Sequence, residues 1–388
     1  MASQSSAKAQ HHQRHDDQLL VEENMATKTL ILNRPKQLNA LTYPMICKLL
    51  ELFLAYEEDP NVNLIILKGK GRTFCSGGDV AALVHDLCQG NGRLGFNFFR
   101  KEFTLNYLIA TYSKPQVSIL NGIVMGGGVG VSIHGRFFVA TENSVFAMPE
   151  TALGLFPDVG ATYFLSRLPG FFGEYLGLTG SRLDDAEMLA CGLATHFVPS
   201  VRLSALEEAL CNVGFSDPAA VSAIIDQYAQ QPNLKEKSIY HRLDAINRCF
   251  SHGTVEDILS ALEAEAMDRA DEWICATIQL LKKASPTSLK ISLGAIREGR
   301  LQGIGQCLVR EYRMVCHVMQ GKLSKDFVEG CRAILLDKDR NPKWQPSKLE
   351  LVSNIVVDHY FQKVDGKEWE DLKLPARLNL PGYATTKI

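Results

Sequence analysis

Residues 121–130 read NGIVMGGGVG and directly follow an apolar run at residues 116–120. Upstream, residues 74–79 read FCSGGD and follow a second apolar run at residues 64–68. Both runs have the length and composition of buried β-strands. Glycine after a strand lets backbone N–H groups face a ligand without obstruction by a side chain, and such donors stabilise negative charge on a carbonyl oxygen. The two segments together therefore predict an oxyanion hole.

These segments resemble the crotonase, or enoyl-CoA hydratase/isomerase, superfamily, in which one N–H from each loop binds the thioester oxygen of an acyl-CoA. The matching positions are Gly78 and Gly127. Two further motifs match in the same order along the chain, LNRPKQLNAL at residues 32–41 and FAMPETALGLFPDVG at residues 146–160. The resemblance implies an α/β fold, a crotonase-like spiral of ββα units, followed here by a helical C-terminal extension.

Length and composition allow a large enzyme. The chain has 388 residues, of which 46% are hydrophobic, enough for a catalytic domain of roughly 200–250 residues and an extension. Lysine plus arginine (41) nearly balances aspartate plus glutamate (43), so no electrostatic surface for nucleic acid or an anionic membrane is expected. Residues 116–135 carry no formal charge, but their six glycines favour a buried core over a membrane helix. Ten cysteines without a C-x-x-C pair indicate reduced thiols in an intracellular compartment.

The pattern of apolar residues divides the chain into three parts. Residues 1–19 are polar and are expected to form a disordered tail, because they match neither a signal peptide nor a transit peptide. Residues 20–200 repeat a strand, loop and helix order, which predicts the crotonase-like catalytic core. Residues 201–388 are predicted to be mainly helical. Helical phasing is expected at residues 42–57, 203–211, 218–229, 270–283, 287–297, 303–320 and 324–336.

Two carboxylates follow the second glycine loop. In hydratases of this superfamily a pair of glutamates flanks the substrate, and Gly130 occupies the first of those positions here. Its lack of a carboxylate disfavours addition of water across a carbon–carbon double bond. Glu150 occupies the second position, and Asp158 follows where many hydratases carry glycine. Both residues also suit structural roles, Glu150 at a helix start after proline and Asp158 in a turn.

The segments around these carboxylates, together with FFRKE at residues 98–102, resemble the 3-hydroxyisobutyryl-CoA hydrolase family, most closely its plant members. The resemblance covers about residues 20–380 and includes SKDFVEGCRA at residues 324–333, in the extension. It implies hydrolysis of 3-hydroxyisobutyryl-CoA, a β-hydroxyacyl-CoA thioester, to 3-hydroxyisobutyrate and CoA in valine breakdown.

Thioester hydrolysis needs a polarised carbonyl, an oxygen nucleophile and release of a thiolate. We expect Gly78 and Gly127 to polarise the carbonyl. Glu150 then either attacks it to form a transient anhydride or serves as general base for water. Asp158 is expected to bind the substrate hydroxyl and assist proton transfer. The family resemblance implies Glu102 as a second contact to that hydroxyl.

Two other functions remain open from the sequence: an enoyl-CoA hydratase or isomerase, and a noncatalytic acyl-CoA-binding protein. A nicotinamide enzyme is disfavoured because no G-x-G-x-x-G register fits the glycine-rich loop. His134 and His196 lack partners at metal-binding spacing, so we expect no metal and no cofactor. The expected partner is the acyl-CoA substrate, and the superfamily resemblance implies a possible homo-oligomer.

The last three residues, Thr386-Lys387-Ile388, are a distant relative of the Ser-Lys-Leu peroxisomal address. Lys387 matches the middle position, whereas the flanking residues differ from the usual serine and leucine. With the plant-like resemblance, this ending favours a peroxisomal location, with the mitochondrion and the cytosol as alternatives.

Overall fold

The computed structural model describes residues 18–90, 92–214, 216–268, 271–364 and 369–377. Residues 1–17 of the predicted tail and the terminal tripeptide lie outside the described residues. The first strand begins at Leu19. The preceding residue, Gln18, is also held in the fold, because its backbone carbonyl accepts a hydrogen bond from the amide of Asn33 at 2.8 Å.

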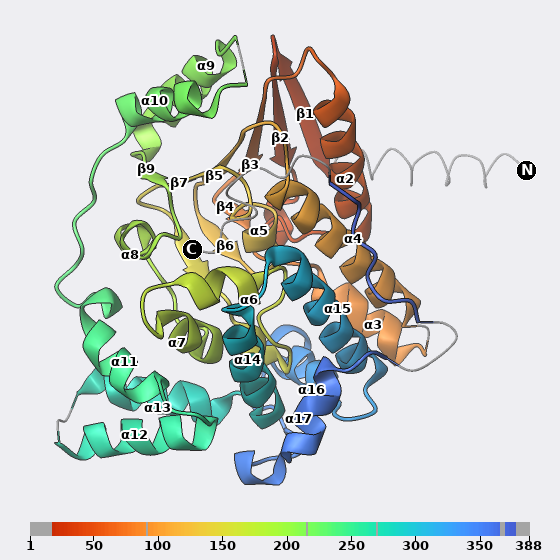
Figure 1. Ribbon diagram of the computed structural model, residues 1–388, viewed down its shortest axis with the longest axis vertical. Helices are drawn as coiled ribbons and strands as arrows, with labels where there is room; N and C mark the ends of the chain where they lie inside the picture. The colour runs from red at the N-terminus through yellow and green to blue at the C-terminus, as the bar shows by residue number, and fades with distance from the viewer. Residues whose placement is uncertain (1–17, 91, 215, 269–270, 365–368, 378–388) are drawn as a thin grey trace, which may run out of the picture.

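The described strands form two sheets (Figure 1). The larger has the order β1-β2-β3-β5-β7-β9; β1 and β2 are antiparallel and every other neighbouring pair is parallel. The smaller sheet is parallel, with the order β4-β6-β8. The strands are β1 (Leu19–Asn24), β2 (Thr27–Leu32), β3 (Leu64–Gly69), β4 (Thr73–Cys75), β5 (Gln116–Leu120), β6 (Ile123–Met125), β7 (Phe137–Ala140), β8 (Val145–Ala147) and β9 (His196–Phe197). Consecutive strands alternate between the sheets from β3 to β8, which is the repeated ββα pattern that the sequence predicted.

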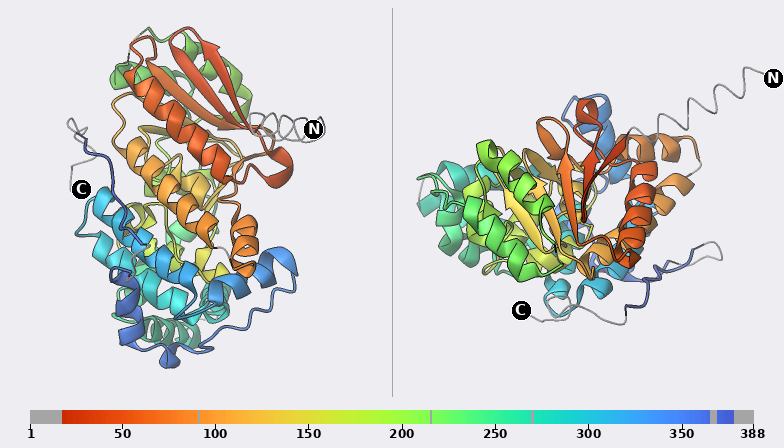
Figure 2. Two further views of the ribbon diagram at one scale, coloured as in Figure 1. Left: turned by 90° about the vertical axis from the view of Figure 1, so that its right-hand side faces the viewer. Right: turned by 90° about the horizontal axis from the view of Figure 1, so that it is seen from above.

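Helices surround these sheets and dominate the second half of the chain. They are α2 (Tyr43–Glu58), α3 (Val80–Cys88), α4 (Arg93–Ala110), α5 (Gly127–Gly130), α6 (Ala161–Phe164), α7 (Phe172–Thr179), α8 (Asp185–Cys191), α9 (Leu203–Cys211), α10 (Pro218–Tyr228), α11 (Leu243–Phe250), α12 (Val255–Asp268), α13 (Glu272–Lys283), α14 (Pro286–Gly299), α15 (Ile304–Gln320), α16 (Asp326–Cys331) and α17 (Asn354–Phe361). Strands β1–β3 lie at one end of the molecule and α11–α13 and α17 at the other (Figures 1 and 2).

The long helix α4 joins the core to the C-terminal region. It packs against α2 on one side and against α15 on the other (Figure 1). Helix α2 begins where the sequence predicted, because the Thr42 hydroxyl caps it by accepting a hydrogen bond from the Met45 amide at 3.3 Å. Its buried face includes Ile46, Leu49 and Phe53. Helix α15 therefore reaches the core through α4, although nearly two hundred residues separate them in sequence.

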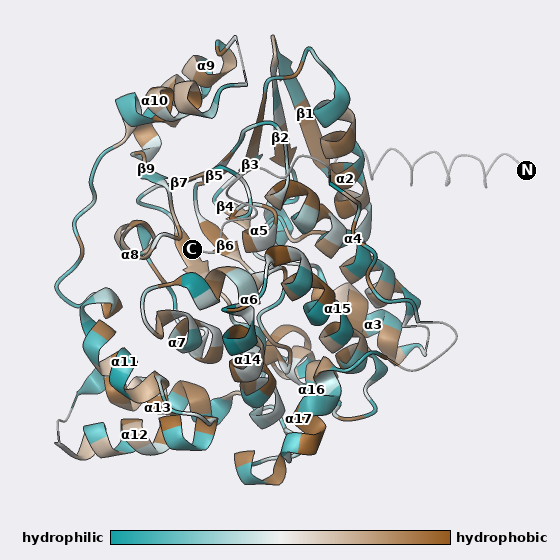
Figure 3. Cartoon of the chain, viewed as in Figure 1, coloured by the Kyte–Doolittle hydropathy of each residue, from teal (hydrophilic) through white to brown (hydrophobic). Residues whose placement is uncertain are grey.

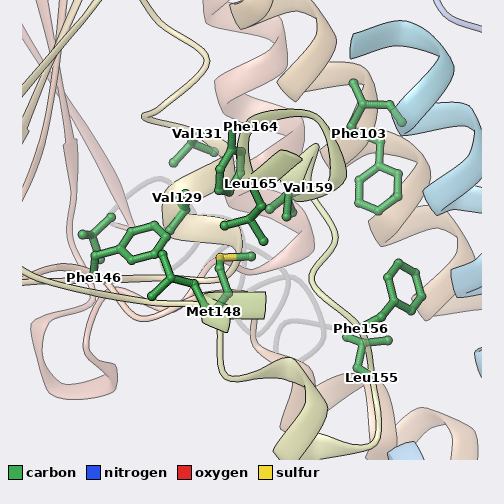
Figure 4. Close-up of a cluster of buried hydrophobic side chains, with 14 of the residues drawn as sticks. Phe103, Val129, Val131, Phe146, Met148, Leu155, Phe156, Val159, Phe164 and Leu165 are labelled. Carbon is green, nitrogen blue, oxygen red and sulfur yellow. The ribbon is translucent and has the colours of Figure 1, made fainter. Parts of the chain in front are cut away.

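The described residues form two hydrophobic cores. The larger includes residues from both the β-rich part and the C-terminal helices, for example Phe103, Phe156 and Leu308. Part of it is drawn in Figure 4. In the smaller core, α9 and α10 cover one face of the large sheet, with Leu206 and Leu210 buried among the strand residues. The division of the chain at residue 200 stays a prediction, and both cores contain residues from each side of it.

The distribution of hydrophobic residues agrees with this packing. The large sheet is rich in hydrophobic residues, whereas outer helices such as α12 and α13 alternate hydrophilic and hydrophobic residues (Figure 3). None of the helices in the described part of the chain combines the length and the apolar character needed to cross a membrane.

Candidate active site

The two glycine loops meet at the ends of neighbouring strands β4 and β6, as the oxyanion-hole prediction requires. A Cβ atom built on Gly127 would lie 3.2 Å from the backbone nitrogen of Gly78. Gly77 has φ +117°, a conformation that side chains rarely adopt, and this glycine turns the first loop toward the second. The backbone on both sides of Gly78 is hydrogen-bonded to Leu41. The Leu41 amide donates to the Gly77 carbonyl, and the Leu41 carbonyl accepts from the Asp79 amide, both at 2.8 Å.

A cavity of about 660 Å³ opens beside these amides. It is lined by every residue that the sequence assigned to the site: Gly78, Glu102, Gly127, Glu150 and Asp158. These residues come from the first glycine loop, from the start of α5, from α4, from the 3-10 helix η2 (Glu150–Leu153) and from the segment after it. The tertiary structure therefore brings all five together around one space.

Three of the carboxyl groups that line the cavity are almost completely buried, whereas a fourth, that of Asp79, is paired with Arg34. Glu102, Glu150 and Asp158 have 1%, 5% and 4% of their surface exposed. Burial raises the pKa of Glu102 well above its ordinary range, and the nearby charges of Asp158 and Glu150 raise it further. Burial, reinforced by Asp158, likewise raises the pKa of Glu150 well above its usual value. Carboxyl groups in this state keep their protons to a higher pH than exposed carboxyl groups do.

Two oxygens of this cluster have no hydrogen-bond partner among the described residues. They are Oε1 of Glu102 and Oε2 of Glu150. A Cβ built on Gly126 would lie 3.0 Å from Oε1 of Glu150, so that carboxyl group adjoins the second glycine loop. Buried polar atoms are normally paired, and unpaired ones in an open cavity are available to a ligand or to water. The unpaired oxygens thus mark the part of the cavity where polar groups of a substrate can bind.

Gly130 is packed so closely that a side chain does not fit. A Cβ atom on it would lie 2.6 Å from Cβ of Val159 and 2.9 Å from Nδ2 of Asn106. Both distances are shorter than real contacts allow, so a larger residue would displace its neighbours. The space next to the position where hydratases carry their first glutamate is therefore filled by Val159 and Asn106.

The backbone after Asp158 has a conformation that the sequence did not reveal. Val159 has φ +54°, which is unusual for a β-branched residue and costs on the order of 1–3 kcal/mol. Its carbonyl oxygen lies 2.7 Å from Nε2 of His134. Its side chain packs in the buried cluster with Phe164 and Leu165 (Figure 4). Tertiary contacts therefore hold this strained turn in place.

A further buried carboxylate, in the C-terminal region, supports the same turn. Glu311 of α15 accepts hydrogen bonds from the Gly160 amide at 2.6 Å and from the Thr162 amide at 3.0 Å, and its Oε1 also accepts from the Thr162 hydroxyl at 2.5 Å. Burial raises the pKa of Glu311 to about 7, although these hydrogen bonds act in the opposite direction. No local motif marks Glu311 as part of the site, because it lies about 150 residues from its partners.

The C-terminal region also forms part of the cavity wall. Ile334 and Leu335 come from a π-helical turn, η6 (Arg332–Leu336), that follows α16. Lys338, with φ +60°, lies just beyond that turn and lines the same cavity. The segment expected to be one helix at residues 324–336 thus changes to a wider helical turn where it meets the cavity. Such turns occur frequently at functional sites.

Two other potentially reactive side chains in this region, Cys75 and His134, are buried and uncharged. Cys75 is fully buried, and burial raises the pKa of its thiol to about 12, so it stays protonated. Burial lowers the pKa of His134 to about 4, which keeps its ring neutral. Within the described ranges, no cluster of three or more histidine, cysteine, aspartate or glutamate residues has an arrangement suited to a metal ion.

Comparison with known proteins identifies the class of enzyme. The model of the family described as enoyl-CoA hydratase/isomerase matches residues 27–361. The chain therefore belongs to the enoyl-CoA hydratase/isomerase family, and the prediction of a crotonase-like α/β fold is confirmed.

Within this family the similarity to individual proteins is extensive. The chain is 68% identical to 3-hydroxyisobutyryl-CoA hydrolase 1 of Arabidopsis thaliana over 96% of its own length and 98% of that protein. It is 42% identical to the 3-hydroxyisobutyryl-CoA hydrolase of Xenopus tropicalis, named as mitochondrial, over 92% and 91% of the two chains. Among solved structures, a carnitinyl-CoA dehydratase from Mycobacterium thermoresistibile is 36% identical with a TM-score of 0.84, covering 93% of this chain and all of that one.

Proposed function

We infer that this protein is a thioester hydrolase that converts 3-hydroxyisobutyryl-CoA and water to 3-hydroxyisobutyrate and CoA. The observation that carries this inference is the composition of the cavity, which is lined by Gly78, Gly127 and the buried carboxyl groups of Glu150 and Asp158, while packing at Gly130 leaves no room for a second glutamate of the hydratase type. The full-length similarity to proteins named for this activity supports the same substrate.

The reaction can be assigned to the residues as follows. The amides of Gly78 and Gly127 bind the thioester oxygen and stabilise its negative charge as the carbonyl is attacked. In one route the Glu150 carboxylate attacks the carbonyl carbon, CoA leaves as the thiolate, and water then hydrolyses the anhydride. In the other, Glu150 removes a proton from water, whose oxygen forms the new C–O bond as the C–S bond breaks. In both routes the CoA sulfur ends as a thiol after accepting a proton.

The remaining polar groups suit the rest of the substrate. We assign Asp158 and Glu102 to the 3-hydroxyl group, since both carboxyl groups are buried in the cavity and one oxygen of Glu102 has no partner among the described residues. Their raised pKa values favour a protonated form that can donate a hydrogen bond. Lys338 lines the cavity from the C-terminal region, and we assign its ammonium group to the phosphates of CoA.

Substitution of Glu150 tests the function directly. Purified protein is given 3-hydroxyisobutyryl-CoA, and release of free thiol is measured with a chromogenic reagent. Loss of the carboxylate in Glu150→Gln should lower kcat by roughly 10²–10⁴-fold, the usual contribution of a general base. Glu350→Gln, at an exposed position, serves as the matched control and should retain wild-type kcat.

Two results would reject the proposal. Equal thiol release by the wild type and Glu150→Gln, with the substrate bound by both, would favour a noncatalytic acyl-CoA-binding protein. A change in absorbance with an enoyl-CoA, without thiol release, would favour a hydratase or isomerase.

We propose a peroxisomal location, from the terminal Thr386-Lys387-Ile388 and the similarity to plant proteins. Some relatives are named as mitochondrial, so the mitochondrion is the alternative. A fluorescent protein fused ahead of the full chain, imaged with and without the last three residues, distinguishes the two. Retention of a mitochondrial signal in both forms would overturn the peroxisomal proposal.

A further inference from the structure

The segment that carries Asp158 turns sharply immediately after this residue. Val159 and Gly160 both have positive φ, +54° and +83°. A Cβ atom on Gly160 would lie 2.6 Å from the His134 ring, so the turn is also closely packed. A β-branched residue does not adopt this conformation unless surrounding structure holds it. The direction of the Asp158 side chain into the cavity therefore depends on what fixes this turn.

Helix α15 provides the main attachment. Both oxygens of Glu311 are used, one by the amide of Gly160 and the other by the amide and hydroxyl of Thr162. The Glu311 side chain is completely buried. Hydrogen bonds to a charged acceptor are stronger than those between neutral groups. Glu311 thus attaches the turn to a helix of the C-terminal region.

The same helix also supports the segment that carries Glu102. Tyr312, next to Glu311, accepts a hydrogen bond on its hydroxyl from Nε of Arg100 at 3.1 Å. Its ring also packs edge-on against Phe103, with centroids 6.4 Å apart. Glu102 lies between these two α4 residues in sequence. Adjacent residues of α15 thus support two of the three buried carboxyl groups in the cavity.

We propose that Glu311 is a positioning residue, which fixes the backbone turn that directs Asp158 into the cavity. The proposal rests on the function proposed above. Its consequence is that the C-terminal region is a working part of the active site, because it determines where a reacting carboxyl group lies.

Charge gives this arrangement a measurable signature. The charge of Glu311 adds to burial in raising the pKa of Asp158. The other charged or titratable groups around the pair are Glu102, Glu150, Arg310, His134 and Cys307. Removal of the Glu311 charge should lower the pKa of Asp158, because a like charge no longer opposes its ionisation. The pH at which the carboxyl cluster titrates in kcat/KM should then move downward.

The experiment compares Glu311→Gln with the wild type. Glutamine retains the size and one acceptor oxygen, but it presents an NH₂ group toward one of the amides and carries no charge. We expect kcat to fall roughly ten- to a hundredfold with little change in KM, because small displacements of a reacting group have effects of this size. The lower limb of the pH profile should shift to lower pH. Glu311→Asp, which keeps the charge, should leave that limb near its wild-type position.

A matched control separates positioning from general damage. Glu174 is equally buried but is bonded to Arg300 away from the cavity. Glu174→Gln should lower thermal stability without moving the pH profile. An unchanged kcat and pH profile in folded Glu311→Gln would overturn the proposal, as would losses that parallel those of Glu174→Gln.

A readout that needs no turnover completes the test. Amide hydrogen exchange of the peptide spanning residues 158–162, followed by mass spectrometry, should be faster in Glu311→Gln than in the wild type, and unchanged in Glu174→Gln. Equal exchange in Glu311→Gln and the wild type would overturn the positioning role. Absence of thiol release by the wild type would instead reject the proposed function, so the two failures are distinguishable.

Discussion

At the scale of single residues, the site depends on the atoms around its glycines. Gly127 needs to lack a side chain because its neighbours are Oε1 of Glu102 and the amide of Gly78. Gly130 needs to lack one because Val159 and Asn106 fill the adjacent space. The sequence indicated both positions, because a glycine within a family motif can be recognised from the sequence alone. The atoms that enforce them come from other segments and became visible only in the fold.

Gly127→Ala should therefore impair catalysis. The new methyl group would lie 2.4 Å from Oε1 of Glu102, which forces the carboxyl group or the loop to move. We expect kcat to fall by about 10²–10³-fold, the typical effect of losing one oxyanion-hole donor. Thiol release under saturating substrate measures this. Gly253→Ala, where a Cβ meets open space, should behave as the wild type; a Gly127→Ala enzyme with the same kcat as this control would contradict the assignment.

At the scale of elements, local periodicity predicted most helices well. The expected helix at residues 203–211 coincides with α9, and that at residues 303–320 with α15. The second glycine loop leads into only a single helical turn, α5, which is followed by turns at residues 131–134. A helix this short has a small dipole, so stabilisation of an oxyanion there rests mainly on the individual amides. The π-helical turn η6 was not predicted, since an inserted residue in a helix leaves almost no trace in periodicity.

Helix α9 should stabilise the catalytic sheet although it lies outside the cavity. Leu206 is 0% exposed in the core that α9 shares with the sheet. Leu206→Ala should lower the free energy of unfolding by about 2–5 kcal/mol, because it removes buried apolar surface and leaves a cavity. Denaturant unfolding measures this change, with Val201→Ala, at a residue 89% exposed, as the control. A loss below about 0.5 kcal/mol, as expected for surface sites, would show that α9 does not contribute to this core.

At the scale of the whole molecule, the active site lies where the β-rich core meets the C-terminal helices. One part supplies the glycine loops, Glu150 and Asp158, and the other supplies Glu311 and the cavity wall around Lys338. Burying several carboxyl groups together opposes folding, because each ionised group loses water and repels the others. Active sites that bury such groups commonly lower the stability of the folded protein.

Removal of one buried carboxylate should therefore stabilise the protein in a pH-dependent way. Glu102 ionises near 4.5 when unfolded, and its pKa is higher in the folded state. Between these two values the folded protein binds a proton that the unfolded chain has lost, so wild-type stability falls as the pH rises. Glu102→Gln has no carboxyl group at this position, so its stability does not fall with pH for this reason. Its free energy of unfolding should equal that of the wild type below about pH 4.5 and exceed it by about 1–3 kcal/mol at pH 8.

Thermal and denaturant unfolding across this pH range provide the measurement. Glu350→Gln, at an exposed position, is the control and should follow the wild type throughout. A stability difference that shrinks as the pH rises would contradict the sign of the pKa shift.

The amino-acid sequence alone determined the glycine loops, the carboxylates at positions 150 and 158, the missing glutamate at position 130 and most of the helices. These features are local, because glycine, motif spacing and apolar periodicity act within a few residues. Only the tertiary structure determined the positive φ of Val159, its contact with His134 and the attachment to Glu311. Those features depend on packing between segments about 25 and 150 residues apart, and no local pattern encodes which distant side chain will occupy a shared buried space.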